Sequence, residues 1–176
     1  MLEAVAISKE QLASELTDKL SPKTIFRCDE PLAKKTTLRV GGPADFYVEP
    51  ASETDLALVL EFCAKNDFPF FILGRGSNLL IKDSGIRGFV ISLGHPAFSE
   101  IKIIGERLHC GVGARAKIIS VEARKNNLAG LEFLEGIPGN LGGALRMNAG
   151  AMGSATFNVV ETIRVMDCSG KIQELN

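Results

Sequence analysis

The sequence predicts a mixed α/β fold with two lobes, and three features support that class. Residues 45–73 show a strand pattern, a helix pattern and a second strand pattern, the order of a βαβ unit. Gly94-His95-Pro96 then marks a boundary. Beyond it, glycine turns at 105–107 and 167–170 lie between short strand patterns, as in hairpins. We expect an N-terminal extension over 1–24, a first lobe over 25–94 and a second, incomplete lobe over 95–176.

Composition describes an ordinary globular protein and excludes several classes of partner. The chain has 176 residues, of which 45% are hydrophobic and 23% charged, and its net charge is −1. A chain of this length can bury roughly 70% of its unfolded surface. Because it has no basic block, we expect neither nucleic acid nor an anionic membrane as its partner. A phosphorylated small molecule stays possible, because backbone amides can bind phosphate.

Cysteine usage and the N-terminus indicate a reducing compartment. The four cysteines contain no C-x-x-C pair, and two histidines provide no zinc-ligand spacing, so we expect free thiols and no metal. No signal-peptide pattern opens the chain, and no apolar run approaches the ~18 residues of a membrane span. We therefore expect a cytoplasmic protein.

Three helices are expected from hydrophobic periodicity and capping signals. Ser8-Lys9-Glu10-Gln11 reads as a capping box, and Pro22 ends the helix that follows. A second helix begins after Ser52 and ends near 66–67, and a third spans 114–127. The residues expected to face the core are Leu12, Leu16 and Leu20 in the first helix, Leu56, Val59, Leu60 and Cys63 in the second, and Ala114, Ile118 and Val121 in the third.

Strands are expected between these helices and in the two hairpins. Residues 70–73 form an apolar run that predicts a buried strand. The other expected strands cover residues 37–40, 45–49, 89–93, 100–104, 108–111, 161–166 and 171–175.

A glycine segment, Gly74-Arg75-Gly76-Ser77-Asn78, follows the expected strand 70–73 and is the first functional signal. Ligands of α/β folds bind at the carboxyl ends of strands. Consecutive N–H groups in a tight turn form a nest for pyrophosphate oxygens, to which Ser77 and Asn78 can add side-chain hydrogen bonds. Taken alone, the segment could also be an ordinary tight turn.

A second glycine-rich segment spans 135–153 and predicts a loop that enters a short helix. Pro138 suits a first helical turn, and we expect the N–H groups after it to point toward an anion. Gly142 and Gly143 would let that helix press against a flat ring. Alone, this segment could be a packing element. Together, the two segments suggest a large anionic ligand gripped from two sides.

The standard nucleotide motifs do not explain these glycines. The chain has no P-loop. Residues 111–116, Gly-Val-Gly-Ala-Arg-Ala, begin like the dinucleotide fingerprint and lie between a strand and a helix. Because no acidic residue ends a second strand at the expected distance, we do not expect a dinucleotide fold of the Rossmann type.

Four motifs in register closely resemble the bacterial UDP-N-acetylenolpyruvoylglucosamine reductases, also called UDP-N-acetylmuramate dehydrogenases. The resemblance covers residues ~25–170, nearly the whole chain. The matching segments are 29–32 with 36–45, then 73–80, then 85–88, and then 136–139 with 142–144 and 147–151.

The resemblance implies an FAD-binding domain of the vanillyl-alcohol-oxidase (PCMH) type, with the flavin between two α/β lobes. Residues implied to line the pyrophosphate are Gly74, Arg75, Gly76, Ser77, Asn78 and Leu79. Those implied to pack along pyrophosphate and flavin are Ile137, Pro138, Gly139, Asn140, Gly142 and Gly143, and those near the isoalloxazine are Asn148, Ala149 and Gly150. Asn140 replaces the usual Ser or Thr, and Met152 replaces a common Tyr.

The family's reaction uses FAD to pass hydride from NADPH to the enolpyruvyl group of a UDP-N-acetylglucosamine ether, in peptidoglycan synthesis. By resemblance, the catalytic arginine, serine and glutamate are expected beyond Asn176, so no catalytic residue is assigned here. Arg146 and Arg164 do not match the arginine's position. We expect this part alone to be inactive and the complete enzyme to be monomeric. The alternatives are a stand-alone flavin-binding module and a related FAD-dependent oxidase with another substrate.

Overall fold

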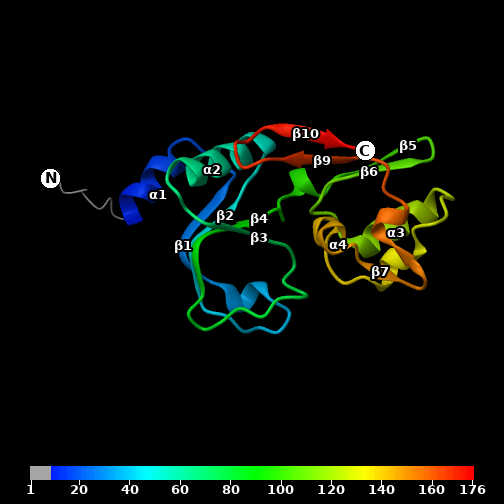
Figure 1. Cartoon of the computed structure of the whole chain (residues 1–176), viewed down its shortest axis with the longest axis horizontal. Coiled ribbons are helices and arrows are strands. Elements are labelled where there is room, and N and C mark those ends of the chain that lie inside the picture. Colours follow the sequence, from blue (N-terminus) through cyan, green and yellow to red (C-terminus); the bar gives the residue numbers. More distant parts are fainter. Residues whose placement is uncertain (1–8) are drawn as a thin grey trace.

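A computed structural model describes residues 9–176 of the chain. Figure 1 shows two groups of elements side by side, with the β9–β10 hairpin running across from one to the other. The group that contains the blue-to-green sheet is the first lobe, and the group that contains α3, α4 and β7 is the second. The expected capping residue, Ser8, lies outside the described residues.

The first lobe contains a sheet with the strand order β1-β2-β4-β3. β1 and β2 are antiparallel, whereas β2 and β3 both run parallel to β4. α2 connects β2 to β3, as the βαβ pattern predicts, and β4 lies between these two strands. The elements are α1 (Lys9–Thr17), β1 (Ile25–Pro31), the 3-10 helix η1 (Leu32–Lys35), β2 (Pro43–Glu49), α2 (Glu53–Lys65), β3 (Phe70–Leu73) and β4 (Ile86–Ser92).

The helices cover this sheet with the faces that their periodicity predicts. Ser52 caps α2 by accepting a hydrogen bond from the Asp55 N–H (3.1 Å). The predicted apolar face of α2 and Leu16 of α1 are buried in one core with sheet phenylalanines. Phe46 and Phe89 stack in that core with ring centroids 4.7 Å apart.

Two strand predictions in the first lobe are wrong. Residues 37–40 are not a strand, because the Thr36 hydroxyl donates to the Val40 carbonyl (2.9 Å) and closes a turn in which Arg39 has φ 55°. The strand that pairs with β2 is instead β1, at residues 25–31, and the sequence patterns did not predict it. β3 exists as predicted but is mostly exposed, because it lies at the sheet edge and, among the described strands, pairs with β4 alone; Ile72 is 45% exposed, whereas Leu73 is buried.

The second lobe is built from hairpins and short helices around its own core. Both predicted hairpins are present, β5 with β6 and β9 with β10. The elements are η2 (Pro96–Phe98), β5 (Ile101–Ile104), β6 (Arg107–Cys110), α3 (Ala116–Lys125), η3 (Glu132–Gly136), α4 (Leu141–Met147), β7 (Gly150–Ala151), β8 (Ser154–Ala155), η4 (Thr156–Asn158), β9 (Ile163–Met166) and β10 (Ile172–Leu175).

The inward face of α3 differs from the prediction. The helix begins at Ala116, and Ala116, Ile119 and Ala123 are buried at intervals of three and four residues. Ile118 therefore points outward and is 44% exposed. Ala114 is buried, but it lies before the first turn.

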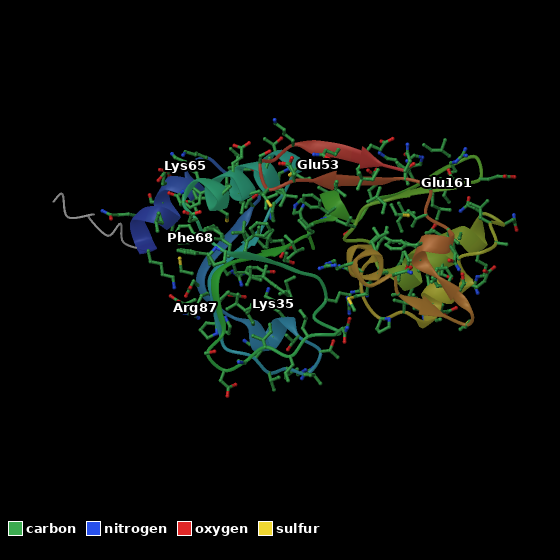
Figure 2. All side chains as sticks on the ribbon, in the orientation of Figure 1. Lys35, Glu53, Lys65, Phe68, Arg87 and Glu161 are labelled. Carbon is green, nitrogen blue, oxygen red and sulfur yellow. The ribbon has the colours of Figure 1, made fainter. Side chains whose placement is uncertain are left out.

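The β9–β10 hairpin connects the two lobes. Arg164 of β9 donates to both carboxylate oxygens of Glu53 on α2 (3.1 Å each), and Met166 packs against the core of the first lobe. At its other end, Glu161 pairs with Arg107 of β6 (2.6 Å). Figure 2 shows Glu53 on α2 beside the hairpin and Glu161 near the second lobe.

Candidate cofactor site

The two glycine-rich segments meet at the boundary between the lobes. The loop after β3 carries Ser77, whose hydroxyl donates to the carbonyl of Pro138 (3.2 Å), 61 residues further along the chain. A Cβ added to Gly139 would lie 3.4 Å from the same hydroxyl oxygen. The pairing that the sequence suggested is therefore present as a direct contact.

A cavity of about 330 Å³ opens beside this contact. Arg75 of the first segment and Asn140 of the second both line it, together with Gly94 and Arg115. Among the described residues, its lining includes two arginines and no acidic side chain. The two guanidinium groups could attract an anion, while the Glu49 carboxylate lies close to Gly94, 3.3 Å from where a Cβ there would be.

Gly74, next to Arg75, and Gly143, in the helix capped by Asn140, have open backbone near the residues that line this cavity. A Cβ added to either would meet no other described atom within 4 Å, and neither has a positive φ. The fold itself does not require glycine at these two positions. A ligand that approaches the backbone closely would require it, so the residues present fit a bound FAD.

At position 76 the fold itself requires glycine, with or without a ligand. Gly76 has φ 61°, and a Cβ there would collide with the carbonyl oxygen of Lys35. Its own carbonyl accepts a hydrogen bond from the Thr37 N–H (3.1 Å). Gly76 therefore holds the loop after β3 against the segment that follows η1. Ser77 and Asn78 are exposed, whereas Leu79 packs against the core beneath the loop.

The motif over residues 36–45 is the support of this loop, a role that the sequence did not indicate. The Gly42 N–H donates to the Lys82 carbonyl (2.9 Å), and a Cβ on Gly85 would collide with the Pro43 carbonyl. Arg87 donates to that carbonyl (3.2 Å) and to Asp45 (2.6 Å). Gly42 and Gly85 therefore allow the backbone of residues 36–45 to pack directly on the backbone of the loop after β3.

A small buried core lies under the same loop. Tyr47 packs there with Leu73 and Ile81, and the Lys35 ammonium lies 4.4 Å from its ring centroid. Burial raises the pKa of the Tyr47 hydroxyl, which donates to Glu49 (3.2 Å). The loop thus rests on a packed surface whose buried phenol is flanked by the charges of Lys35 and Glu49.

The expectation that amides after Pro138 point toward an anion is wrong for two of them. The N–H groups of Leu141 and Gly142 donate to the carbonyls of Ala114 and Val112 (2.8 Å each). The helix begins at Leu141, beyond Pro138, with Asn140 as its N-cap. A Cβ on Gly142 would lie 3.3 Å from Val112, so this glycine serves packing between protein segments.

The remaining predicted residues all make contacts within the second lobe. Ile137 and Ala149 pack in its core, and a Cβ on Gly150 would lie 2.6 Å from the Ser154 carbonyl. Asn148 adopts φ 43°, and its side-chain oxygen accepts from the Phe157 N–H (2.9 Å). Proximity of Asn148, Ala149 and Gly150 to the isoalloxazine stays a prediction.

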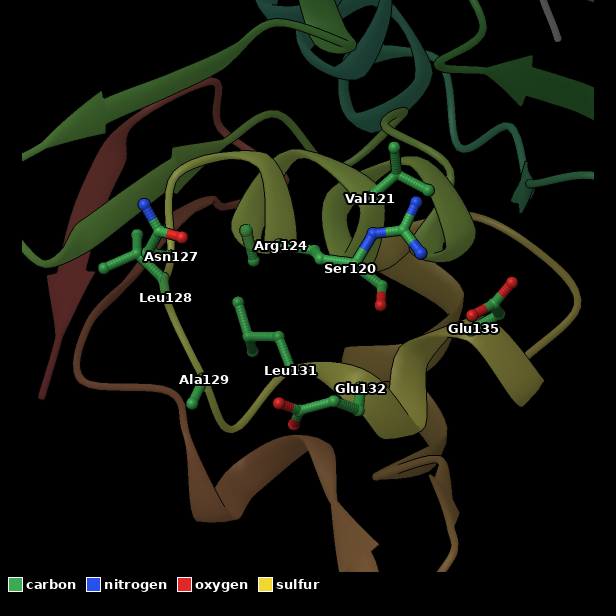
Figure 3. Close-up of a pocket in the computed structure, with 10 residues that line it drawn as sticks. Ser120, Val121, Arg124, Asn127, Leu128, Ala129, Leu131, Glu132 and Glu135 are labelled. Atoms are coloured by element: carbon green, nitrogen blue, oxygen red, sulfur yellow. The ribbon is translucent and has the colours of Figure 1, made fainter.

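A larger cavity, about 380 Å³, lies between α3 and η3 and contains none of the predicted site residues (Figure 3). Both of its carboxylates have partners: Glu135 lies 3.4 Å from Lys117, and Glu132 accepts from the Gly130 N–H (2.9 Å). Arg124, Leu128 and Leu131 also line this cavity. Size alone therefore does not identify the functional cavity.

Metal and membrane signals are absent from the described part of the chain. No group of three or more His, Cys, Asp or Glu residues there could hold a metal ion. No helix within residues 9–176 has the length and apolarity to cross a membrane. The cysteines form no disulfide, and burial raises the pKa of Cys63 to about 12 and of Cys110 to about 11.

The fold and the site define a cofactor-binding domain, and comparison with known proteins identifies the cofactor. The family model for the FAD binding domain matches residues 44–176, so the chain belongs to that family. FAD is its cofactor. The predicted fold class, a two-lobed FAD-binding domain of the vanillyl-alcohol-oxidase type, is confirmed.

The resemblance to the reductases is confirmed as well. UDP-N-acetylenolpyruvoylglucosamine reductase of Clostridioides difficile (strain 630) is 44% identical over 154 residues, which are 88% of this chain and 50% of that protein. The Heliobacterium modesticaldum protein of the same name is 45% identical over 144 residues, which are 82% of this chain and 46% of that protein. The chain spans about half the length of the curated relatives it matches.

Solved structures agree with this assignment. The crystal structure of UDP-N-acetylenolpyruvylglucosamine reductase (MurB) from Thermus caldophilus matches with a TM-score of 0.70 and 30% identity, over 87% of this chain and 52% of that one. 6-Hydroxy-D-nicotine oxidase from Arthrobacter nicotinovorans matches with a TM-score of 0.68 and 18% identity, over 89% and 36%. The second likeness shows the fold alone.

Proposed function

We propose that the chain is the FAD-binding part of an NADPH-dependent UDP-N-acetylenolpyruvoylglucosamine reductase, which forms UDP-N-acetylmuramate for peptidoglycan. Relatives of that name at 40–45% identity support the proposal. The observation that carries it is the contact between Ser77 and Pro138, which joins the two glycine-rich segments at a cavity. NADPH dependence and a monomeric complete enzyme follow from the resemblance. A cytoplasmic location follows from the cysteine usage and the absence of a signal-peptide pattern, and the division into lobes at residues 94 and 95 follows from the turn signal Gly94-His95-Pro96.

The chain's own residues bind and orient the cofactor. Gly74 and Gly143 allow close approach of the backbone, and the Ser77, Asn78 and Asn140 side chains supply hydrogen bonds. Bound FAD supplies the hydride-transfer chemistry, while the protein sets its position and its electrostatic surroundings. Lobes on two sides of the flavin would restrict water.

The oxidase alternative has little support. The 6-hydroxy-D-nicotine oxidase is only 18% identical in sequence, so its similarity to this chain concerns the fold alone. A stand-alone flavin-binding module would bind FAD as the reductase part does, but it would hold the flavin without catalysing the reduction. Both alternatives predict FAD binding, so FAD binding alone does not separate them from the reductase.

We expect the 176-residue polypeptide to bind FAD but not to reduce UDP-N-acetylenolpyruvoylglucosamine. Hydride delivery to an enol ether requires stabilisation of the developing charge and a positioned acid, each worth orders of magnitude in rate. We assign no residue of this chain to those roles. The test measures NADPH consumption by the FAD-loaded chain with and without substrate. A substrate-dependent rate well above the NADPH-oxidase background would contradict this assignment.

A further inference from the structure

The cavity between α3 and η3 contains a hydroxyl group that nothing in the described chain uses. Ser120 of α3 lines this cavity and is only 9% exposed. Within residues 9–176 its hydroxyl has no hydrogen-bond partner, not even the carbonyl one turn earlier in the same helix. Figure 3 shows the Ser120 oxygen pointing from α3 into the space toward η3. Because buried polar groups in native proteins are nearly always hydrogen-bonded, this hydroxyl indicates a partner from outside the described chain.

Two opposite charges on the walls of this cavity also have no counter-charge among the described residues. Arg124 lies one turn after Ser120 on α3 and forms no ion pair there, whereas the next residue, Lys125, pairs with Glu122 (2.7 Å). On the η3 side, the Glu132 carboxylate accepts from one neutral backbone N–H (2.9 Å). No ion pair joins Arg124 to Glu132 in the described structure, so both charges are available to a ligand.

Apolar side chains line another part of the cavity. Leu128 and Leu131 come from the segment that joins α3 to η3, and Val121 comes from α3 itself. The volume of about 380 Å³ lies near the lower end of the range for ligand pockets, roughly 300–1,000 Å³. A small ligand that is partly charged and partly apolar therefore fits this cavity best.

The arrangement of the charges selects among small ligands. A ligand with only a negative charge would face the carboxylates of Glu132 and Glu135 without a favourable partner for them. A ligand with only a positive charge would leave the Arg124 guanidinium and the Ser120 hydroxyl without a partner. A zwitterion complements both walls at once.

We propose that this cavity is a second binding site, for a free α-amino acid with an apolar side chain. The ligand carboxylate binds the Arg124 guanidinium and accepts from the Ser120 hydroxyl, and the ligand ammonium group binds the Glu132 carboxylate. The apolar side chain packs against Leu128 and Leu131. This cavity shares no lining residue with the one between the glycine-rich segments, so the inference is independent of the proposed function.

The test titrates L-leucine into the isotope-labelled 176-residue chain and follows the amide chemical shifts by NMR. We expect saturable shifts at residues 120–135, with a dissociation constant of roughly 1 mM or tighter. Three analogues each lack one recognised group: isocaproate has no ammonium group, isoamylamine has no carboxylate, and glycine has no apolar side chain. Each analogue should bind at least about tenfold more weakly than leucine.

Variants of the two charged residues test the same contacts from the side of the protein. Arg124→Gln and Glu132→Gln should each weaken leucine binding about tenfold or more, because each leaves one ligand charge without its partner. Both side chains are exposed, so the fold should be preserved, which circular dichroism checks. The matched control is Lys125→Gln, which removes the neighbouring charge outside the cavity lining and should leave leucine affinity unchanged.

The possible outcomes are distinct from those of the FAD titration. Absence of saturable shifts at about 20 mM leucine, or shifts confined to residues outside 120–135, would refute the site. Binding of isocaproate as tightly as leucine, or equal effects of Arg124→Gln and Lys125→Gln, would refute recognition of a zwitterion. Neither result would change the FAD assignment, and a failure of FAD binding would leave this site standing.

Discussion

Gly74 and Gly76 stand two residues apart in the loop after β3, yet the structure gives them different reasons to be glycine. Gly76 has φ 61° and lies against the Lys35 carbonyl, so a side chain there would disturb the loop whether or not a ligand is bound. Gly74 faces open space. The spacing of the motif identified the loop from sequence, but a one-dimensional pattern does not show which glycine touches protein and which remains open.

Gly74→Val and Gly143→Val should each lower FAD affinity at least about tenfold while leaving the free energy of unfolding nearly unchanged. The added side chains would occupy space that the ligand needs, and a Cβ at either position would have no described atom within 4 Å outside its chain neighbours and its own helix. Affinity would be measured by flavin fluorescence, and stability by urea unfolding without FAD. Ala129→Val, an exposed substitution elsewhere in the second lobe, is the control. Wild-type affinity in both folded glycine variants would remove these positions from the site.

Gly76→Val should behave differently. The collision with backbone at Lys35 should destabilise the first lobe by about 1–3 kcal/mol, because a strained φ and a steric clash add. Urea unfolding with and without FAD separates this effect from a loss of binding. A variant as stable as the wild-type chain would show that the 35–37 segment does not fix the loop.

At the scale of elements, α2 shows how local signals and tertiary contacts combine. Sequence predicted its start at Ser52 and its buried face, because capping and 3.6-residue periodicity are local properties. The role of Asp55 was not predictable, since its partners Ser21 and Thr24 come from a distant segment. Both donate to its carboxylate (3.0 Å each), as does the Ser52 hydroxyl (3.0 Å). Burial alone would raise the pKa of Asp55, but these hydrogen bonds outweigh it and lower the pKa below 3.8.

Asp55→Asn should lower the free energy of unfolding at pH 7 by about 1.5–3 kcal/mol, because an amide cannot accept all of these hydrogen bonds. Since the folded pKa is depressed, the stabilisation by ionised Asp55 is complete well above pH 3.8 and is lost as the pH falls through the folded pKa. Urea unfolding at a series of pH values from 7 downward should show the difference between the two proteins shrinking as the pH falls below 3.8. Asp18→Asn, at an exposed position, is the control. A constant difference between wild type and Asp55→Asn across this range would contradict the role assigned to the carboxylate.

Other elements were mispredicted for reasons that are also tertiary. β3 has the apolar composition of a buried strand, but its edge position depends on the strand order β1-β2-β4-β3, which no local pattern encodes. Leu141 and Gly142 have the sequence of an anion-binding helix start, yet their N–H groups are used by residues 112–114. In both cases the environment of the segment depends on contacts with residues far away in the sequence.

At the scale of the whole molecule, the β9–β10 hairpin segment contacts both lobes. Its ion pair, Arg164 with Glu53, is more than half exposed on both sides, and such pairs contribute about 0–1 kcal/mol. Met166, by contrast, packs against the first core. Apolar packing should therefore be the stronger of the two links.

Met166→Ala should lower the free energy of unfolding by about 1–2 kcal/mol, less than a fully buried methionine would, because this side chain is half-buried. Arg164→Ala should cost less than about 1 kcal/mol, and that loss should shrink at high salt. Urea unfolding at low and high ionic strength measures both. A larger loss for Arg164→Ala than for Met166→Ala would reverse this ranking.

The central claim is that two glycine-rich segments, far apart in sequence, meet at the lobe boundary and together hold FAD. The most direct measurement is a titration of the 176-residue chain with FAD, followed by flavin fluorescence and absorbance, with Gly74→Val and Gly143→Val titrated in parallel. The account predicts saturable binding of one FAD per chain in the micromolar range, weakened by a change in either segment. Absence of binding at several hundred micromolar FAD, with circular dichroism showing a folded chain, would contradict it.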